Sequence, residues 1–336
     1  MNQETSKTLY RLKAFALVAI VMAHTYYTEI PNEWAVRYIH RFCTAGVFCF
    51  FFLSGFFFHP TKGQAAAFIR KKLSSLVCPW FFCSSLYFAL LVVTHTMSPN
   101  LKHYINFVLG NGSFLYYLTV LCIFYLLFWH FSQNRAVLLL SILLSVFSTV
   151  LTGREVLPGL VDPDKWIFTY LNPYLNIFNW IGIFSLGVLF QENMYMEKTL
   201  QTVGKRWWAF TIGAFLSVLV LTPFDNNDGY WSNFSLILEA VIVLGLLGLA
   251  CGMGNKKVSM SLETIGRLTL PVYLLHMPIQ NRILASPSMR GSVVCAVLRP
   301  VITICLIAGI MTVFRKLLRY LPEKLESVAC TVFGLK

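Results

Sequence analysis

Long apolar runs separated by short polar segments dominate the chain. The segment "RLKAFALVAIVMAH" (11–24) is typical, because it opens on polar residues and continues as an apolar run. A membrane-spanning helix needs roughly 17 to 25 apolar residues. Runs of this kind cover residues 10–27, 41–58, 75–95, 114–132, 136–152, 175–191, 206–223, 232–253, 265–284 and 294–314. The pattern predicts an all-α, polytopic integral membrane protein with about ten transmembrane helices.

The composition agrees with lipid as the solvent for much of the surface. Hydrophobic residues make up 57% of the 336 residues and charged residues 12%, whereas soluble domains carry about 25% charged residues. No long polar stretch separates the runs. We therefore expect a single membrane domain over 1–336, with no appended soluble domain.

The basic residues predict the orientation. Ten spans place both termini on one side, and most of the 27 Lys and Arg fall on that side when they are assigned to alternate helix ends. Because Lys and Arg accumulate in cytoplasmic loops, we expect both termini in the cytoplasm. The expected location is the inner (plasma) membrane, as a multi-pass protein. The same bias explains the net charge of +13. It indicates contact with anionic membrane lipids rather than nucleic acid.

Three ionisable side chains lie well inside the predicted spans: His24, Glu239 and His276. Such groups are costly in a membrane and usually have a function or a partner. Each also has a structural interpretation, because a histidine near a helix end can bond to a carbonyl and a buried glutamate can be protonated and packed. The nine cysteines show no CxxC or Cys/His spacing, so we expect neither a disulfide framework nor a metal site.

His24 has a special spacing to Lys13. Eleven helical steps turn through ~1,100° and rise ~16 Å, so the two residues share one helix face. Arg11 lies on another face and is interpreted as a topology charge. A cation near the cytosol and a titratable base deeper on the same face suit a substrate with an anionic head, a long arm and a reactive end. Coenzyme A thioesters have this form.

Five further segments carry a family resemblance. They are "GVFCFFFLSGFFF" (46–58), "FIRKKLSSLVCPWFF" (68–82), "SFLYYLTVL" (113–121), "FSLGVLF" (184–190) and "IGRLTLPVYLLHMPI" (265–279). In this order, on ten spans and over nearly the whole chain, they resemble the membrane acyltransferase-3 family, whose members O-acylate cell-surface glycans. The family motif of Arg or Lys, ten residues and then His falls on Lys13 and His24.

The chain departs from the family pattern at two places. The family's Arg-x-x-Arg before the third span has its nearest match in Lys72 and Ser75, and its Leu-Trp-Phe-Leu reads "LYYL" (115–118). These departures put individual substrate contacts in doubt, but they do not change the assignment to the acyltransferase class.

The resemblance implies transfer of an acyl group, most often acetyl, from cytosolic acyl-CoA (acetyl-CoA) to a hydroxyl of a cell-surface or lipid-linked glycan. His24 would be the general base or would carry the acyl group itself. The CoA phosphates would be bound by Lys13, Arg70, Lys71 and Lys72.

Four further residues are candidates. Glu239 would orient the His24 ring as a second catalytic residue. Substrate contacts would come from Ser54, Tyr273 and His276, by lining the pocket or donating to the developing oxyanion. The alternative for Ser54-Gly55 is close helix packing. Two acidic, aromatic loops, 153–166 and 225–231, are further candidate glycan contacts.

Two other function classes stay open at this point. A transporter or exporter of a glycan precursor would also have ten spans and would use buried His and Glu side chains as a proton relay. The lack of an internal repeat argues against an inverted-repeat transporter. A structural partner of surface-polymer enzymes is the other alternative.

Overall fold

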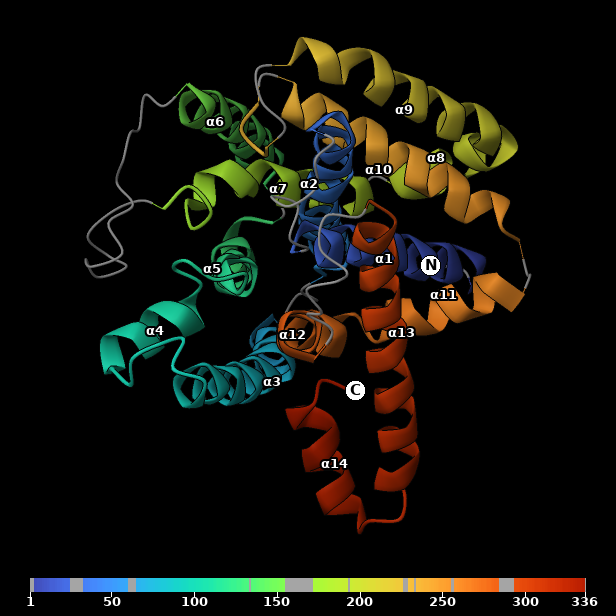
Figure 1. The fold of residues 1–336 in the computed structure, drawn as a ribbon. Helices are drawn as coiled ribbons and strands as arrows, with labels where there is room; N and C mark the ends of the chain where they lie inside the picture. The colour runs from blue at the N-terminus through green and yellow to red at the C-terminus, as the bar shows by residue number, and fades with distance from the viewer. Residues whose placement is uncertain are drawn as a thin grey trace. The chain divides into compact units, whose positions relative to one another are not determined.

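Every regular element that the structure describes is a helix (Figure 1). The computed structural model describes residues 3–24, 33–59, 65–132, 134–154, 172–192, 194–225, 229–232, 234–254, 257–283 and 293–335. Within these ranges the all-α prediction is confirmed.

Each predicted apolar run contains a helix. These helices are α1 Gln3–Ala23, α2 Glu33–Phe56, α3 Ala65–Val93, α5 Tyr116–Phe131, α6 Arg135–Gly153, α7 Ile177–Glu192, α9 Trp207–Leu221, α10 Ser235–Gly252, α12 Thr269–Pro278 and α13 Val293–Leu318. Six of them, α2, α3, α6, α9, α10 and α13, are long and apolar enough to cross a membrane. The helices α5 and α7 are apolar but shorter, α1 opens on polar turns and α12 has 10 residues. Six spans are therefore supported, and ten stays a prediction, as does the side on which the termini lie.

Four further helices lie outside the predicted runs, except that the last three residues of α11 overlap the run 265–284: α4 Leu101–Leu109, α8 Tyr195–Lys205, α11 Lys257–Arg267 and α14 Glu323–Val332. On α8 the buried residues are Met196 and Val203, seven positions apart. Seven residues make about two helical turns, so they share one face. α8 is amphipathic and, at 11 residues, shorter than the length a membrane span needs.

Two helix boundaries differ from the prediction in ways that matter for the site. The helix α2 begins at Glu33 rather than near residue 41, so Arg37 and Arg41 lie inside it. The helix α1 ends at Ala23, so His24 is a turn residue directly after it. Hydropathy alone predicts neither boundary. Residues 33–40 are part of α2, and α1 ends within the predicted apolar run 10–27.

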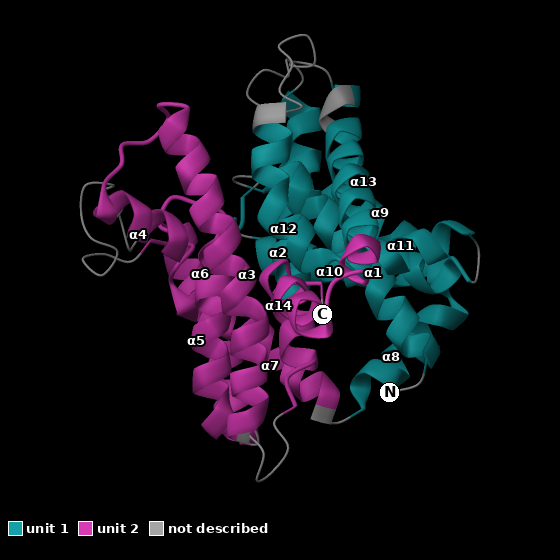
Figure 2. Cartoon of the chain, turned by 90° about the horizontal axis from the view of Figure 1, so that it is seen from below, with its two compact units in different colours: residues 1–50, 192–314 teal, residues 51–191, 315–336 magenta. Residues whose placement is uncertain are grey.

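The chain forms two compact units, each built from separate stretches of sequence (Figure 2). Unit 1 comprises Met1–Phe50 and Glu192–Phe314, and unit 2 comprises Phe51–Gln191 and Arg315–Lys336. In unit 1, α1 packs against α10, α11 and α12, and α10 lies beside α9 and α8 (Figure 1). In unit 2, α3 packs against α4, α5 and α14.

An aromatic cluster forms the core of unit 2. The Phe51 ring lies 4.7 Å from Tyr117, 5.7 Å from Phe124 and 5.2 Å from Trp180, measured between ring centroids. Aromatic rings bury large apolar areas and interact favourably at such distances. The aromatic run of residues 46–58 therefore supplies core packing, as its composition indicates.

Candidate active site

His24 lies at the end of α1, in the turn that follows the helix. Its backbone N–H donates to the Val21 carbonyl at 3.3 Å, and its side chain is half-buried. The imidazole ring of His276, from α12, lies 5.1 Å from the His24 ring between centroids. Two of the residues singled out in the sequence, separated by more than 200 positions, are thus brought together in unit 1.

The protonation of His276 follows from its hydrogen bond. The side chain is fully buried, and its Nδ1 lies 2.5 Å from the carbonyl oxygen of Tyr273. Because a carbonyl oxygen only accepts, Nδ1 must carry the proton and donate. A neutral His276 then has its lone pair on Nε2, the nitrogen that can accept a proton. Tyr273, a predicted substrate contact, thus acts on His276 through its backbone.

The backbone beyond His276 is irregular. The helix α12 contains Pro278 and passes into a π-helical turn, η3 Ile279–Ile283, in which Gln280 is fully buried. π-Helical turns are rare and are frequent at functional sites. The end of α12 therefore combines a pair of imidazole rings with a π-helical turn, and we take it as the candidate active site of unit 1.

Lys13 lies on α1 about three turns before His24. The helix is unbroken between them as far as Ala23, so the helical spacing assumed from the sequence holds. The Lys13 Nζ lies 5.5 Å from the centroid of the Tyr10 ring, and the guanidinium carbon of Arg267 lies 4.4 Å from the same centroid. Two cations from α1 and α11 therefore contact one aromatic ring.

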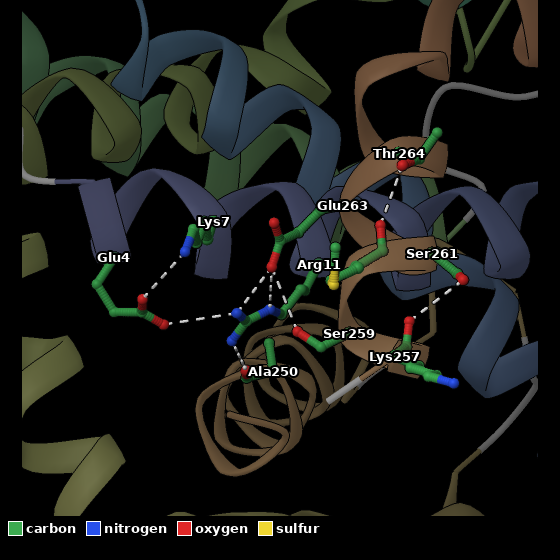
Figure 3. A network of polar contacts seen from close by, with 10 residues as sticks. Glu4, Lys7, Arg11, Ala250, Lys257, Ser259, Ser261, Glu263 and Thr264 are labelled. Atoms are coloured by element: carbon green, nitrogen blue, oxygen red, sulfur yellow. Dashed lines mark hydrogen bonds and ion pairs between the residues drawn. The ribbon is translucent and has the colours of Figure 1, made fainter. Parts of the chain in front are cut away.

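Arg11 is more than a topology charge. It is fully buried, and its Nε and Nη2 donate to Oε1 of Glu263 at 3.0 and 2.8 Å (Figure 3). Its Nη1 donates to the Ala250 carbonyl at 3.2 Å, and Nη2 lies 3.5 Å from Oε1 of Glu4. Arg11 thus joins α1 to the end of α10 and to α11. Burial and long-range pairing explain why the sequence pattern alone did not identify this role.

Glu239 belongs to a second buried polar cluster, on α2, α10 and the segment after α9. Arg41 is paired with Asp225, and its Nη1 donates to Ser232 at 2.6 Å. Glu239 is 2% exposed, and its carboxyl group lies near Thr44 and the charge of Arg41. The contacts that the structure gives for Glu239 are to this cluster, whereas the His24 ring contacts His276. The role of Glu239 as the orienting partner of His24 stays a prediction.

Sequence reasoning missed three buried charges. Arg41 seemed to mark a span end because α2 was expected to begin there. Asp225 opens the loop 225–231 and was interpreted as a candidate glycan contact, but it is 6% exposed. Arg299, inside α13, is 4% exposed, and its Nε and Nη2 have no hydrogen-bond partner among the described residues. A search for every charge within an apolar run would have found Arg299.

The other candidates belong to unit 2. The Ser54 hydroxyl lies 2.9 Å from the Tyr117 hydroxyl. A Cβ added at Gly55 would lie 2.0 Å from the Phe184 carbonyl oxygen, and one at Gly187 would lie 2.0 Å from the Phe52 carbonyl oxygen. The helices α2 and α7 therefore cross backbone to backbone, which supports the packing interpretation for Gly55. The Ser54 hydroxyl is not part of this crossing and forms a hydrogen bond with the Tyr117 hydroxyl.

The basic cluster begins α3. Arg70 and Lys71 are exposed and Lys72 is half-buried, with its Nζ 5.5 Å from the Phe68 ring centroid. At 29 residues α3 is about 43 Å long, more than the ~30 Å of a hydrocarbon core. Its first turns can therefore extend beyond the membrane. The candidate loop residues 155–166 and 226–228 lie outside the described residues.

Comparison with known proteins places these residues in a family. No curated protein and no solved structure matches the chain. The acyltransferase-3 family model, described as an acyltransferase domain, matches residues 9–314. This range contains His24, His276, Lys13 and all other candidate residues, and it runs through both compact units. The matched helical segments agree with a membrane acyltransferase. The chain therefore belongs to the acyltransferase-3 family, as its ordered motifs indicated.

Proposed function

We propose that the protein transfers an acyl group, most often acetyl, from cytosolic acyl-CoA to a hydroxyl of a cell-surface or lipid-linked glycan in the inner membrane. The observation that carries the proposal is the imidazole of His24 at the end of α1, 5.1 Å from the fully buried imidazole of His276. A neutral imidazole has an unprotonated ring nitrogen, which is suited to accept the proton of a hydroxyl during acyl transfer.

The reaction exchanges two bonds. The bond between the acyl carbonyl carbon and the CoA sulfur breaks, and a bond between that carbon and the acceptor oxygen forms. The proton leaves the hydroxyl for His24 and ends on the departing thiolate as CoA thiol. If His24 carries the acyl group first, its nitrogen forms the intermediate bond and the same atoms balance over two steps.

His276 is a positioning residue in this proposal. Its Nδ1–H is held by the Tyr273 carbonyl at 2.5 Å, so the ring is fixed in orientation and tautomer. A fixed ring beside His24 limits the orientations that His24 can adopt, which lowers the cost of reaching the reactive geometry. Ser54 and the cluster Arg70–Lys72 keep their proposed roles in acceptor and phosphate binding, and Glu239 keeps its proposed role in orienting His24.

The test is acyl transfer by purified variants. His24→Ala should abolish release of free CoA from acetyl-CoA in the presence of isolated cell envelopes, with a loss of at least 10²-fold, since general-base catalysis contributes roughly 10²–10⁴. The matched control is His130→Ala, which removes an exposed histidine near the end of α5. It should keep the wild-type rate.

The cellular readout is the ester content of surface glycans, measured by NMR in cells with the wild-type protein, with no protein and with His24→Ala. Normal esterification by His24→Ala would remove the catalytic role of this residue. Equal ester content with and without the protein would contradict the glycan acceptor. Gel filtration of each variant establishes that it is folded.

A further inference from the structure

The Tyr10 ring lies near two cationic side chains in unit 1. The Lys13 Nζ is 5.5 Å and the Arg267 guanidinium carbon 4.4 Å from the centre of its ring. Lys13 comes from α1, whereas Arg267 is the last residue of α11. A cation over an aromatic face is attracted by the ring, but two cations near one ring also repel each other. An anion that binds to both cations would offset that repulsion.

Arg267 has no carboxylate partner among the described residues, although its own helix offers one. Glu263 lies four residues earlier on α11, the spacing at which a carboxylate and an arginine usually pair. Its Oε1 instead accepts from Arg11 at 2.8 and 3.0 Å and from the Ser259 hydroxyl at 3.3 Å (Figure 3). The buried Arg11 therefore neutralises Glu263 and leaves the exposed Arg267 available to an external anion.

The backbone holds Arg267 in this place. A Cβ added at the preceding residue, Gly266, would lie 2.0 Å from the Tyr10 carbonyl oxygen. The end of α11 thus touches α1 at Tyr10 itself, and only glycine allows this approach. Arg267 is positioned beside Tyr10 by a fixed backbone contact of the neighbouring Gly266 as well as by its own side chain, and such preorganisation favours binding.

We propose that Lys13, Tyr10 and Arg267 form a binding site for the phosphate groups of acyl-CoA at the cytosolic end of α1. This inference rests on the proposed function and adds Arg267, which the sequence analysis did not select. The guanidinium offers a planar fork that matches two phosphate oxygens, while the Lys13 ammonium adds a point charge. The reactive thioester can then extend along α1 toward His24, ~16 Å away.

The experiment measures CoA affinity by isothermal titration with the purified full-length protein in a neutral detergent. Arg267→Gln should weaken CoA binding at least tenfold, because it removes charge-assisted hydrogen bonds to phosphate. The matched control is Lys257→Gln, which removes the same charge from the first residue of the same helix, where the side chain is exposed. It should stay within twofold of wild type.

Two further measurements test whether Arg267 contacts the phosphate groups of CoA. Pantetheine, which lacks phosphates, should bind wild type and Arg267→Gln equally. Raising the salt concentration should weaken CoA binding less in Arg267→Gln than in wild type, because the variant has lost one charged contact. Arg267→Lys, which keeps the charge but not the fork, should bind CoA with intermediate affinity and provides a folded comparison.

The outcomes separate this site from the proposed function. If the wild type does not bind CoA, the proposed function fails and this inference fails with it. If the wild type binds CoA and Arg267→Gln matches Lys257→Gln, only the Arg267 site is wrong. If Arg267→Gln loses binding of phosphatidylglycerol vesicles but not of CoA, the anion is a lipid headgroup and the proposal is overturned.

Discussion

Two buried arginines of unit 1, Arg41 and Arg299, differ in what surrounds their guanidinium groups. Arg41 is paired with Asp225, whose carboxylate is also buried. Arg299 has two nitrogen atoms without a hydrogen-bond partner among the described residues. Removing one member of a buried ion pair leaves the other charge uncompensated, whereas removing an unsatisfied charge does not. The two side chains should therefore differ in their effect on stability.

Arg41→Met should lower the free energy of unfolding by about 3–5 kcal/mol, because it leaves the Asp225 carboxylate buried without its cation. The matched substitution Arg299→Met should leave the free energy of unfolding unchanged or raise it. Thermal unfolding in detergent measures both. The double variant Arg41→Met/Asp225→Leu should recover most of the loss. Equal losses for Arg41→Met and Arg299→Met would contradict the assignment of the two environments.

At the same scale, the sequence predicts His24 as a candidate but not the residue that it contacts. The spacing from Lys13 and the apolar surroundings identified His24 from α1 alone, because helical geometry is local. The neighbouring ring of His276 could be named as a candidate but not as a partner. Nothing in the order of residues says that the end of α12 meets the end of α1.

Among the elements, glycines decide where helices touch. The helices α2 and α7 approach so closely that a Cβ on Gly55 would lie 2.0 Å from the Phe184 carbonyl oxygen. A rigid backbone atom at that distance cannot yield without moving the helix. From the sequence, Ser54-Gly55 could serve either close helix packing or substrate binding. In the structure, Gly55 lies where α2 and α7 cross. The Ser54 hydroxyl lies near the Tyr117 hydroxyl.

Gly55→Ala should therefore destabilise unit 2, by at least the roughly 1–3 kcal/mol typical of overpacking. Gly213→Ala is the control. Gly213 lies within α9, and an added Cβ would meet no atom within 4 Å, so alanine should be neutral or stabilise the helix by about 0.5–1 kcal/mol. Unfolding in detergent compares the two. A stable Gly55→Ala protein would mean that α2 and α7 do not cross backbone to backbone.

For the whole molecule, the distribution of basic residues predicts the orientation in the membrane. Basic residues predict that α8 and α11 face the cytoplasm and that the segment before α4 faces outward. The six helices that meet the length and composition of a span support membrane insertion.

Single cysteines test this orientation in a variant without native cysteines. A cysteine at Lys198→Cys, exposed on α8, should react with a membrane-impermeant maleimide only after the cells are permeabilised. A cysteine at Leu101→Cys, 70% exposed at the start of α4, should react in intact cells. The reverse pattern would invert the topology and would place the Lys13 end of α1 away from cytosolic acyl-CoA.

The sequence by itself determined the helical class, the position of the apolar helices, the family and the choice of His24, because hydropathy, helical periodicity and ordered motifs are properties of local sequence. The tertiary structure decided which groups meet: His24 with His276, Arg11 with Glu263, Arg41 with Asp225, and Arg267 with Tyr10. These contacts join residues far apart in the chain. They depend on how helices pack, which no local pattern records.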